Sequence, residues 1–286
     1  MLRLSNLRKA TKFGPNRFRD LRKDSPMNEL VKKVALITGG GYGIGKKIAL
    51  RYAEAGAKVA IAARSVEPMR ETCAELEKAG AEAIWLQADV SKEADCARMV
   101  EETVRRFGRI DILVNNAGVA GPTKRITDMT LAEWQEVLDI DLTGAWLASR
   151  AAIPPMDRQR SGNILMISSG AGRRGYPLRS PYAASKWAMI GLTQTLAGEW
   201  GARGIRVNCI CPGAIEGDRI ERVIRARAES LGQPYEQVKQ AFVSQAALGR
   251  MATEDEVARV ALFLVSQASS GITGQTINVD CGSIMN

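Results

Sequence analysis

Short apolar runs alternate with longer mixed stretches along most of the chain. Runs such as Val34-Ala35-Leu36-Ile37 are typical of strands that are buried on both faces of a sheet. The stretches between these runs predict helices, and Gly56 and Gly80 stand where two of the helices would end. From Lys33 onward, the pattern therefore predicts strands and helices in alternation.

The predicted strands are 34–37, 59–63, 83–86, 112–114, 163–167, 205–210 and 276–279. The predicted helices are 44–55, 68–79, 92–107, 131–152, 181–200 and 254–266, with two shorter ones in 220–248. Ser91 is the expected N-cap of the third helix. This order predicts the α/β class: a doubly wound parallel sheet with helices on both faces, in one domain that covers residues 31–286.

Residues 1–30 lack this pattern and form a basic tail. Residues 1–26 hold eight lysines and arginines against two aspartates, and their low hydrophobicity predicts a disordered extension. An arginine-rich organellar transit peptide and a basic arm for a polyanion are the alternatives. The other residues carry 32 basic and 29 acidic side chains, so the net charge of +9 does not indicate a nucleic-acid-binding domain.

The composition narrows the chemistry of this chain of 286 residues. It has no histidine, which excludes a His-based triad and a His-ligated metal within one chain. Its five cysteines form no Cys-x-x-Cys pair, which favours a reduced, cytoplasmic setting. No apolar run reaches the roughly 18–20 residues of a membrane span. We therefore expect no metal, membrane or nucleic-acid partner.

A glycine-rich turn follows the first predicted strand and reads Thr38-Gly39-Gly40-Gly41-Tyr42-Gly43-Ile44-Gly45. Glycines allow a tight turn and let the backbone approach a pyrophosphate, while the next helix offers N–H donors at its N-terminus. At this place in an α/β chain, the turn predicts a dinucleotide-binding site. The candidate cofactor residues here are Gly39, Gly41, Tyr42, Gly43 and Ile44.

The end of the second predicted strand bears on the choice between NADP and NAD. An acidic residue there would bind the adenosine ribose hydroxyls and favour NAD. This chain instead has Ala62-Ala63-Arg64, and an arginine pairs well with a 2′-phosphate. We expect NADP to be preferred. The alternative is that Arg64 is a solvated loop residue and both cofactors bind.

Further motifs follow in order along the chain: Asp89-Val90, Asn115-Asn116-Ala117-Gly118, Ser168-Ser169, Tyr182-Ala183-Ala184-Ser185-Lys186, Asn208 and Pro212-Gly213. Together with the glycine-rich turn, they resemble the short-chain dehydrogenase/reductase family, in particular its 3-oxoacyl-acyl-carrier-protein-reductase-like branch. The resemblance covers nearly the whole chain after the tail. It implies a Rossmann-like sheet of strand order 3-2-1-4-5-6-7, usually in a homotetramer or homodimer.

The resemblance also implies roles for single residues. Asp89 would lie beside the adenine amine with Val90 against the ring, and Asn116 would steady the central sheet. Gly213 and Ile215 would close over the nicotinamide carboxamide. For catalysis, the matching residues are Ser169, Tyr182 as the acid/base and Lys186 as its activating partner, and the last two would also contact the cofactor.

Physical chemistry supports the catalytic assignment independently. Tyr182 and Lys186 are four residues apart on a predicted helix, so they share a face, and a nearby ammonium stabilises a phenolate. Tyr182 then suits proton transfer to a carbonyl oxygen as a hydride arrives at carbon. A hydroxyl such as that of Ser169 suits the developing oxyanion.

Two positions depart from the family pattern. The family often has an asparagine where this chain has Asp141, and that asparagine orients a water linked to the lysine. An aspartate lacks the NH₂ donor and could add negative charge near Lys186, so we expect a modified proton relay. The loop after Gly213 lacks the usual threonine, and Arg219 or Arg222 could meet an acidic substrate group. A solvated basic helix face is the favoured interpretation of these arginines.

The sequence therefore predicts an NAD(P)-dependent oxidoreductase that moves a hydride between nicotinamide and a secondary alcohol or ketone. 3-Oxoacyl thioesters, secondary alcohols, sugars and cyclic diols are candidate substrates. The alternative is a non-catalytic, dinucleotide-sensing or scaffold protein on the same fold, because a fold does not fix a function.

Overall fold

The computed structural model describes residues 29–285, so the predicted extension lies almost entirely outside the described residues. Seven strands form one parallel sheet in the order β3-β2-β1-β4-β5-β6-β7, which confirms the predicted fold class and topology. The strands are β1 (Val34–Thr38), β2 (Lys58–Ala63), β3 (Ala83–Gln87), β4 (Ile112–Asn115), β5 (Gly162–Ile167), β6 (Ile205–Pro212) and β7 (Thr276–Val279).

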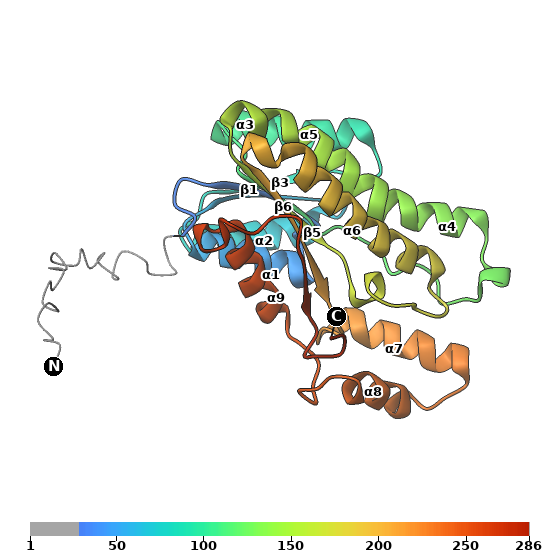
Figure 1. Ribbon diagram of the computed structural model, residues 1–286. Helices are drawn as coiled ribbons and strands as arrows, with labels where there is room; N and C mark the ends of the chain where they lie inside the picture. The colour runs from blue at the N-terminus through green and yellow to red at the C-terminus, as the bar shows by residue number, and fades with distance from the viewer. Residues whose placement is uncertain (1–28, 286) are drawn as a thin grey trace, which may run out of the picture.

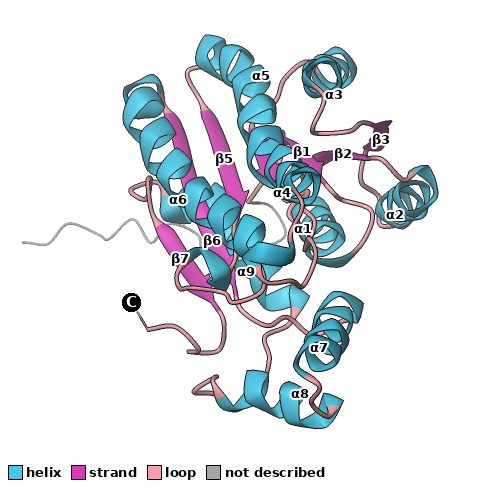
Figure 2. Cartoon of the chain, turned by 90° about the vertical axis from the view of Figure 1, so that its right-hand side faces the viewer, coloured by secondary structure: helices cyan, strands magenta, loops and turns pink. Residues whose placement is uncertain are grey.

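The helices flank this sheet and extend beyond it (Figures 1 and 2). They are α1 (Gly43–Glu54), α2 (Val66–Lys78), α3 (Glu93–Phe107), α4 (Leu131–Leu138), α5 (Gly144–Gln159), α6 (Ser180–Trp200), α7 (Asp218–Leu231), α8 (Tyr235–Ser244) and α9 (Glu254–Val265). Among the described residues, no helix combines the length and apolarity needed to cross a bilayer.

The alternation of side chains along each strand divides the core into two layers. On β1, Ala35 and Ile37 face one layer, which is completed by α1, α2 and α9. Leu36 faces the opposite layer, where α3, α5 and α6 cover the sheet. Because successive strand residues point to opposite faces, an uninterrupted apolar run is what a strand with two covered faces needs.

Two details of the helices differ from the sequence prediction. The predicted helix 131–152 is α4 followed by a π-helical turn, Asp139–Thr143, and then α5, which continues to Gln159. Ser91 is not an N-cap: Lys92 holds that position, and Ser91 donates its amide and hydroxyl to Asp89 instead. The second difference reflects a local hydrogen-bonding partner, Asp89, that competes with the capping role.

Helices α7 and α8 form a separate layer beyond the carboxyl ends of the strands (Figure 1). Ile224 and Ala228 of α7 pack with Val238 of α8 and with Met251, in a small cluster distinct from the two cores of the sheet. This pair of helices covers the end of the sheet at which ligands of open α/β folds bind.

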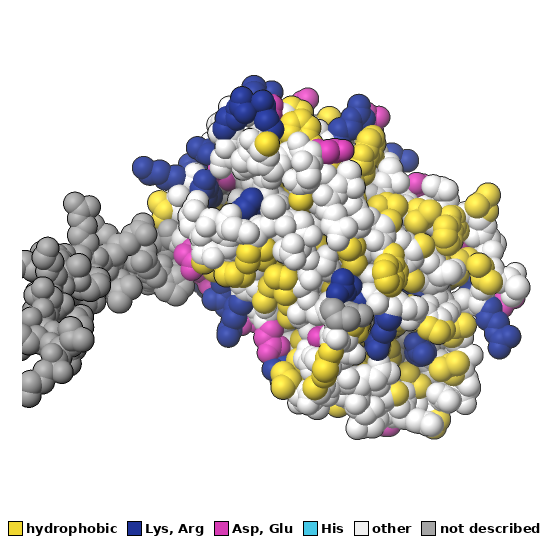
Figure 3. Space-filling view, viewed as in Figure 1, with side chains coloured by type: hydrophobic (Ala, Val, Ile, Leu, Met, Phe, Trp, Pro, Cys, Tyr) yellow, Lys and Arg dark blue, Asp and Glu magenta, His cyan; other side chains and the backbone are white. Residues whose placement is uncertain are grey.

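Basic side chains are spread over the face of the molecule shown in Figure 3, between apolar and neutral surface.

At one corner of the sheet, a single buried carboxylate gathers several donors. Asp111, 1% exposed, accepts the Val34 amide at 3.0 Å and pairs with Lys33 and with two nitrogens of Arg109. The predicted tail ended at residue 30, yet Leu30 is buried and bonded to Ala55, so the folded body includes it.

We expect Asp111→Ala to lower the free energy of unfolding by about 2–3 kcal/mol, because it leaves the buried Val34 amide without its acceptor. Urea unfolding of the purified protein measures this change. Asp111→Asn keeps an acceptor oxygen and should lose less. A loss within about 0.5 kcal/mol for the alanine variant would contradict the assigned role.

Candidate active site

A cleft of about 1240 Å³ lies at the carboxyl ends of the strands. Its walls come from the loops that follow β1 to β6 and from α7. Pockets for one small molecule usually measure about 300–1,000 Å³, so this cleft has room for a cofactor and a substrate together. Of the predicted site residues, all except Gly41 and Asp141 line it.

The glycine-rich turn forms the floor of the cleft. Gly39 and Gly43 have φ of +68° and +60°, a conformation that favours glycine. A Cβ at Gly45 would stand 2.4 Å from the Asn116 amide nitrogen and from the Gly39 carbonyl oxygen, so a side chain has no room there. The turn therefore brings bare backbone and the N-terminus of α1 to the cleft, as a bound pyrophosphate requires.

Asn116 holds this turn in place from β4. Its side-chain amide donates to the carbonyls of Thr38 and Gly39 at 2.9 and 3.1 Å, and its own backbone amide donates to the Thr38 hydroxyl. These bonds tie the start of the loop after β4 to the end of β1.

Gly41 differs from its prediction as a cofactor residue. It is buried and faces α2, where a Cβ would come within 3.1 Å of Pro68, and its carbonyl accepts the Thr72 hydroxyl at 3.1 Å. Its small size allows the turn and α2 to pack closely, and it does not line the cleft.

The adenosine end of the cleft carries Asp89, Val90 and Arg64. One oxygen of Asp89 accepts the Ser91 amide and hydroxyl at 3.0 and 2.8 Å, which orients the carboxylate. Arg64 is exposed, and its guanidinium has no hydrogen-bond or ion-pair partner among residues 29–285. It is therefore available to a charged ligand at this end.

Glu254 adds a carboxyl group near the phosphate-binding turn. Its Oε1 would lie 3.5 Å from a Cβ at Gly43 and at Gly217. Burial raises the pKa of Glu254 above its usual value, although the nearby Lys47 charge acts in the opposite direction.

The predicted catalytic residues come from two adjacent elements. Tyr182 and Lys186 lie one turn apart on α6, and Ser169 follows β5. The Ser169 hydroxyl oxygen accepts the Ala171 amide at 3.1 Å, which leaves its proton free to donate elsewhere. Ser168 points the other way and donates to the Lys186 carbonyl, so that it ties the end of β5 to α6.

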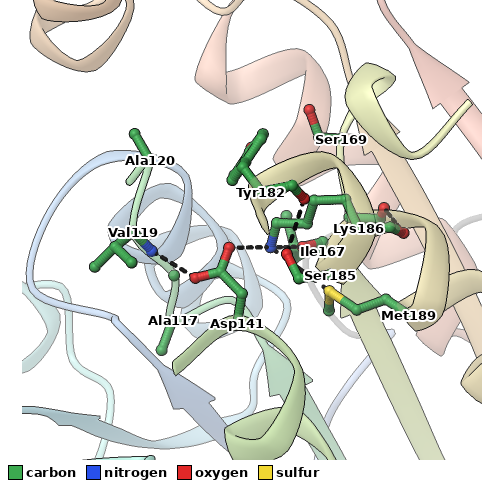
Figure 4. A network of polar contacts seen from close by, with 12 residues as sticks. Ala117, Val119, Ala120, Asp141, Ile167, Ser169, Tyr182, Ser185, Lys186 and Met189 are labelled. Carbon is green, nitrogen blue, oxygen red and sulfur yellow. Dashed lines mark hydrogen bonds and ion pairs between the residues drawn. The ribbon is translucent and has the colours of Figure 1, made fainter. Parts of the chain in front are cut away.

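Lys186 and Asp141 form a buried ion pair behind Tyr182 (Figure 4). The Lys186 nitrogen lies 3.3 Å from Oδ2 of Asp141 and 3.2 Å from the Ile167 carbonyl, and 5.6 Å from the centre of the Tyr182 ring. The other Asp141 oxygen accepts the Val119 amide at 2.7 Å. The expected negative charge beside Lys186 is therefore present.

The π-helical turn brings Asp141 to this position. Asp141 is fully buried, and a Cβ at Gly118 would touch its carboxylate at 3.2 Å, so the loop after β4 packs directly on it. π-turns are rare and often occur at functional sites because they redirect one side chain within a helix. Here the side chain in the turn is the ion-pair partner of Lys186.

Gly213 and Ile215 lie at the far wall of the cleft. A Cβ at Gly213 would come within 2.5 Å of the Asp280 Cβ, which fixes glycine there. Ile215 bridges to Ala252, which joins the loop after β6 to the segment before α9.

The substrate end of the cleft holds arginines from two sides. Arg219, at the start of α7, donates to the Gly118 carbonyl at 3.2 Å, and Arg222 is exposed on the same wall. Sequence reasoning missed Tyr176 and Arg179, which also line this end. The signal that could have found Arg179 is its spacing of three residues from Tyr182, close to one helical turn.

Comparison with known proteins places this arrangement in a family. The family described as Enoyl-(Acyl carrier protein) reductase matches residues 39–283. A 3-oxoacyl-(acyl-carrier-protein) reductase of Synechocystis sp. is 39% identical over 261 residues, which are 91% of this chain and 100% of that protein. An uncharacterized oxidoreductase of Thermotoga maritima is also 39% identical, over 88% of this chain and 97% of that protein.

The chain belongs to the short-chain dehydrogenase/reductase family.

Solved structures of the same family agree with this assignment. NAD⁺-bound xylitol dehydrogenase matches with a TM-score of 0.87 and 33% identity, over 89% of this chain and 100% of that one. Levodione reductase matches with a TM-score of 0.84 and 34% identity, over 88% and 97%. The protein is accordingly an NAD(P)-dependent oxidoreductase that acts on CH–OH and C=O groups.

We expect Asp141→Asn to alter the pH profile of alcohol oxidation and to move it toward lower pH. The carboxylate offsets the positive field of Lys186, so its removal lets the ammonium favour the Tyr182 phenolate more strongly. Initial rates across pH with saturating cofactor measure the shift. A profile that coincides with that of the wild type would contradict this role for Asp141.

Proposed function

We propose that this protein is an NADP-preferring ketone reductase or secondary-alcohol dehydrogenase in which Tyr182 is the acid/base. The observation that carries the proposal is the position of Lys186: its buried ammonium lies beside the Tyr182 ring and lines the cleft that begins at the glycine-rich turn. This position lets one charge serve both proton transfer and cofactor binding.

In this mechanism, the bound nicotinamide supplies or accepts the hydride. The Tyr182 hydroxyl donates a proton to the carbonyl oxygen, and the phenolate that remains is stabilised by the Lys186 ammonium. The Ser169 hydroxyl, whose oxygen accepts the Ala171 amide, donates a hydrogen bond to the same oxygen as negative charge develops on it. In the oxidation direction, the Tyr182 phenolate accepts the alcohol proton.

Lys186 has three partners of unequal strength. It forms an ion pair with Asp141, and it donates hydrogen bonds to the Ile167 carbonyl and to the Met189 sulfur at 3.5 Å, a weak acceptor. We propose that the ribose hydroxyls of the cofactor replace the sulfur contact, because a hydroxyl is the better partner for an ammonium. The ion pair to Asp141 would be kept.

The adenosine end supports NADP as the preferred cofactor. Arg64 and Ser65 directly follow β2, and both line the cleft. Arg64 is exposed, and neither residue is a carboxylate. A guanidinium forms charge-assisted hydrogen bonds to a 2′-phosphate, which NAD lacks. Asp89 and Val90 would hold the adenine, and Gly39, Tyr42, Gly43 and Ile44 the pyrophosphate.

The free cysteines and the exposed apolar side chains support proposals for the cellular compartment and the oligomeric state. All five cysteines are free thiols, which suits a reducing cytoplasm. Leu131 of α4 and Trp146 of α5 are 78% and 44% exposed, and such apolar side chains support assembly into a homodimer or homotetramer. We propose a small-molecule substrate and no nucleic-acid partner, since the charge of the folded body is nearly balanced.

Tyr182→Phe should lower kcat by about 10²- to 10⁴-fold, because it removes the proton donor. The dissociation constant of the cofactor should change little. A carbonyl panel followed by the absorbance of the reduced nicotinamide measures turnover, and fluorescence titration measures cofactor binding. A wild type that binds cofactor tightly yet turns over no compound would favour the dinucleotide-sensing alternative.

Arg64→Ser should lower kcat/KM for NADPH by about 10- to 100-fold and leave that for NADH almost unchanged. The reason is that only NADPH carries the phosphate that Arg64 would bind. Steady-state kinetics with both cofactors measure the ratio. A wild type that prefers NADH would refute the assignment.

A further inference from the structure

Arg179 is a buried cation at the substrate end of the cleft. It is only 5% exposed and stands at the N-cap of α6, three residues before Tyr182. Its Nη1 donates to the carbonyls of Ala120 and Gly121 at 2.8 and 3.4 Å. Within residues 29–285, no carboxylate forms an ion pair with it.

The surroundings of Arg179 add positive charge and no compensating negative charge. Burial lowers the pKa of Arg179 below its usual value, and the positive charges of Arg219 and Arg227 act in the same direction. Arg227 lies over the rings of Tyr176 and Phe242, and Arg174 bonds to the neutral Gln245. Carbonyl dipoles and aromatic rings are therefore the partners of these cations.

Such an arrangement is unfavourable without a further partner. A buried charge costs several kcal/mol unless it is paired and hydrogen-bonded, and like charges nearby increase that cost. Glu229 lines the same cleft but forms no ion pair with any of the described arginines. A ligand anion would supply the missing counter-charge.

The chain also keeps a strained turn just before Arg179. Leu178 has a φ of +69°, which is costly for a bulky residue, and its carbonyl accepts the Lys124 amide at 3.0 Å. This turn leads the chain directly into α6. It therefore fixes the direction from which Arg179 enters the cleft.

We propose that Arg179 binds a carboxylate of the substrate, so that the substrates are oxo acids and the corresponding hydroxy acids. This inference rests on the proposed function, since Tyr182 marks where the reacting carbonyl lies. Arg179 at the N-cap of α6 and Tyr182 in its first turn line the same end of the cleft, so the carboxylate is separated from the carbonyl by only a few bonds. A 3-oxoacyl thioester carries no charge at that distance from its ketone.

The geometry of a guanidinium suits this task. Nη1 is used by the loop after β4, and the remaining N–H groups form a planar fork that matches a carboxylate. The carboxylate would then be fixed by Arg179 while the carbonyl meets Tyr182 and Ser169, so two points would orient the substrate for hydride transfer.

The test compares oxo acids with their methyl esters as substrates of the purified full-length protein. The probes are short 2-oxo, 3-oxo and 4-oxo acids, each with its ester, at saturating reduced cofactor. The wild type should reduce at least one acid with a kcat/KM about 10-fold or more above that of its ester. In Arg179→Gln, kcat/KM for the acid should fall by about 10- to 100-fold, mainly through KM, while the ester keeps its value within about twofold.

Two further variants separate charge from structure. Arg179→Lys keeps the charge but loses the fork, and it should retain part of the preference for the acid. Arg225→Gln removes a charge from α7 at a residue that packs on Tyr235 outside the cleft, and it should behave as the wild type. Equal losses on acid and ester in Arg179→Gln would mean that Arg179 only holds the loop, and would overturn the proposal. A wild type that does not distinguish acid from ester would overturn it as well.

A binding measurement keeps this inference distinct from the proposed function. If the wild type reduces no carbonyl compound, the proposed function fails, and saturation-transfer NMR with butyrate and butyramide decides the inference. The wild type with oxidised cofactor should bind butyrate in preference to butyramide, and Arg179→Gln should lose that preference. No Arg179-dependent preference would overturn the inference.

Discussion

The ion pair between Lys186 and Asp141 is the interaction on which the organisation of the site depends. It joins α6 to the π-helical turn, and through Val119 and Ile167 it also joins the ends of β4 and β5. Both charges are buried, and each lowers the free-energy cost of burying the other. The pair therefore ties the helix that carries Tyr182 to the loop after β4 and to the end of β5, which line the cleft.

Much of this fold was predictable because its strands are buried on both faces. Continuous apolar runs such as Val34 to Ile37 have one simple interpretation, and parallel order then places every strand end on one side. Motifs at those ends, from the glycine-rich turn to Tyr182 and Lys186, had to converge. For this reason nearly all the site residues predicted from the sequence line one cleft.

The features that sequence reasoning missed depend on tertiary partners. The π-helical turn carries Asp141, whose carboxylate contacts Lys186 and Val119 from remote parts of the chain. Ser91 suits an N-cap, but it hydrogen-bonds to Asp89 instead. From the sequence alone, Arg179 would be expected on the surface because arginines are mostly exposed. In the structure it is buried and bonded to the loop after β4. Each case is a side chain whose partner is remote or competes locally.

The separate small core of α7 and α8 bears on which substitutions the enzyme tolerates and on its local stability. Ile224, Ala228, Val238 and Met251 pack with one another apart from the two layers of the sheet. Substitutions on this helical pair can thus alter substrate choice with little effect on the stability of the main body. The same independence lets the pair open as one unit of low local stability, so its amides should exchange with solvent sooner than those of the central strands.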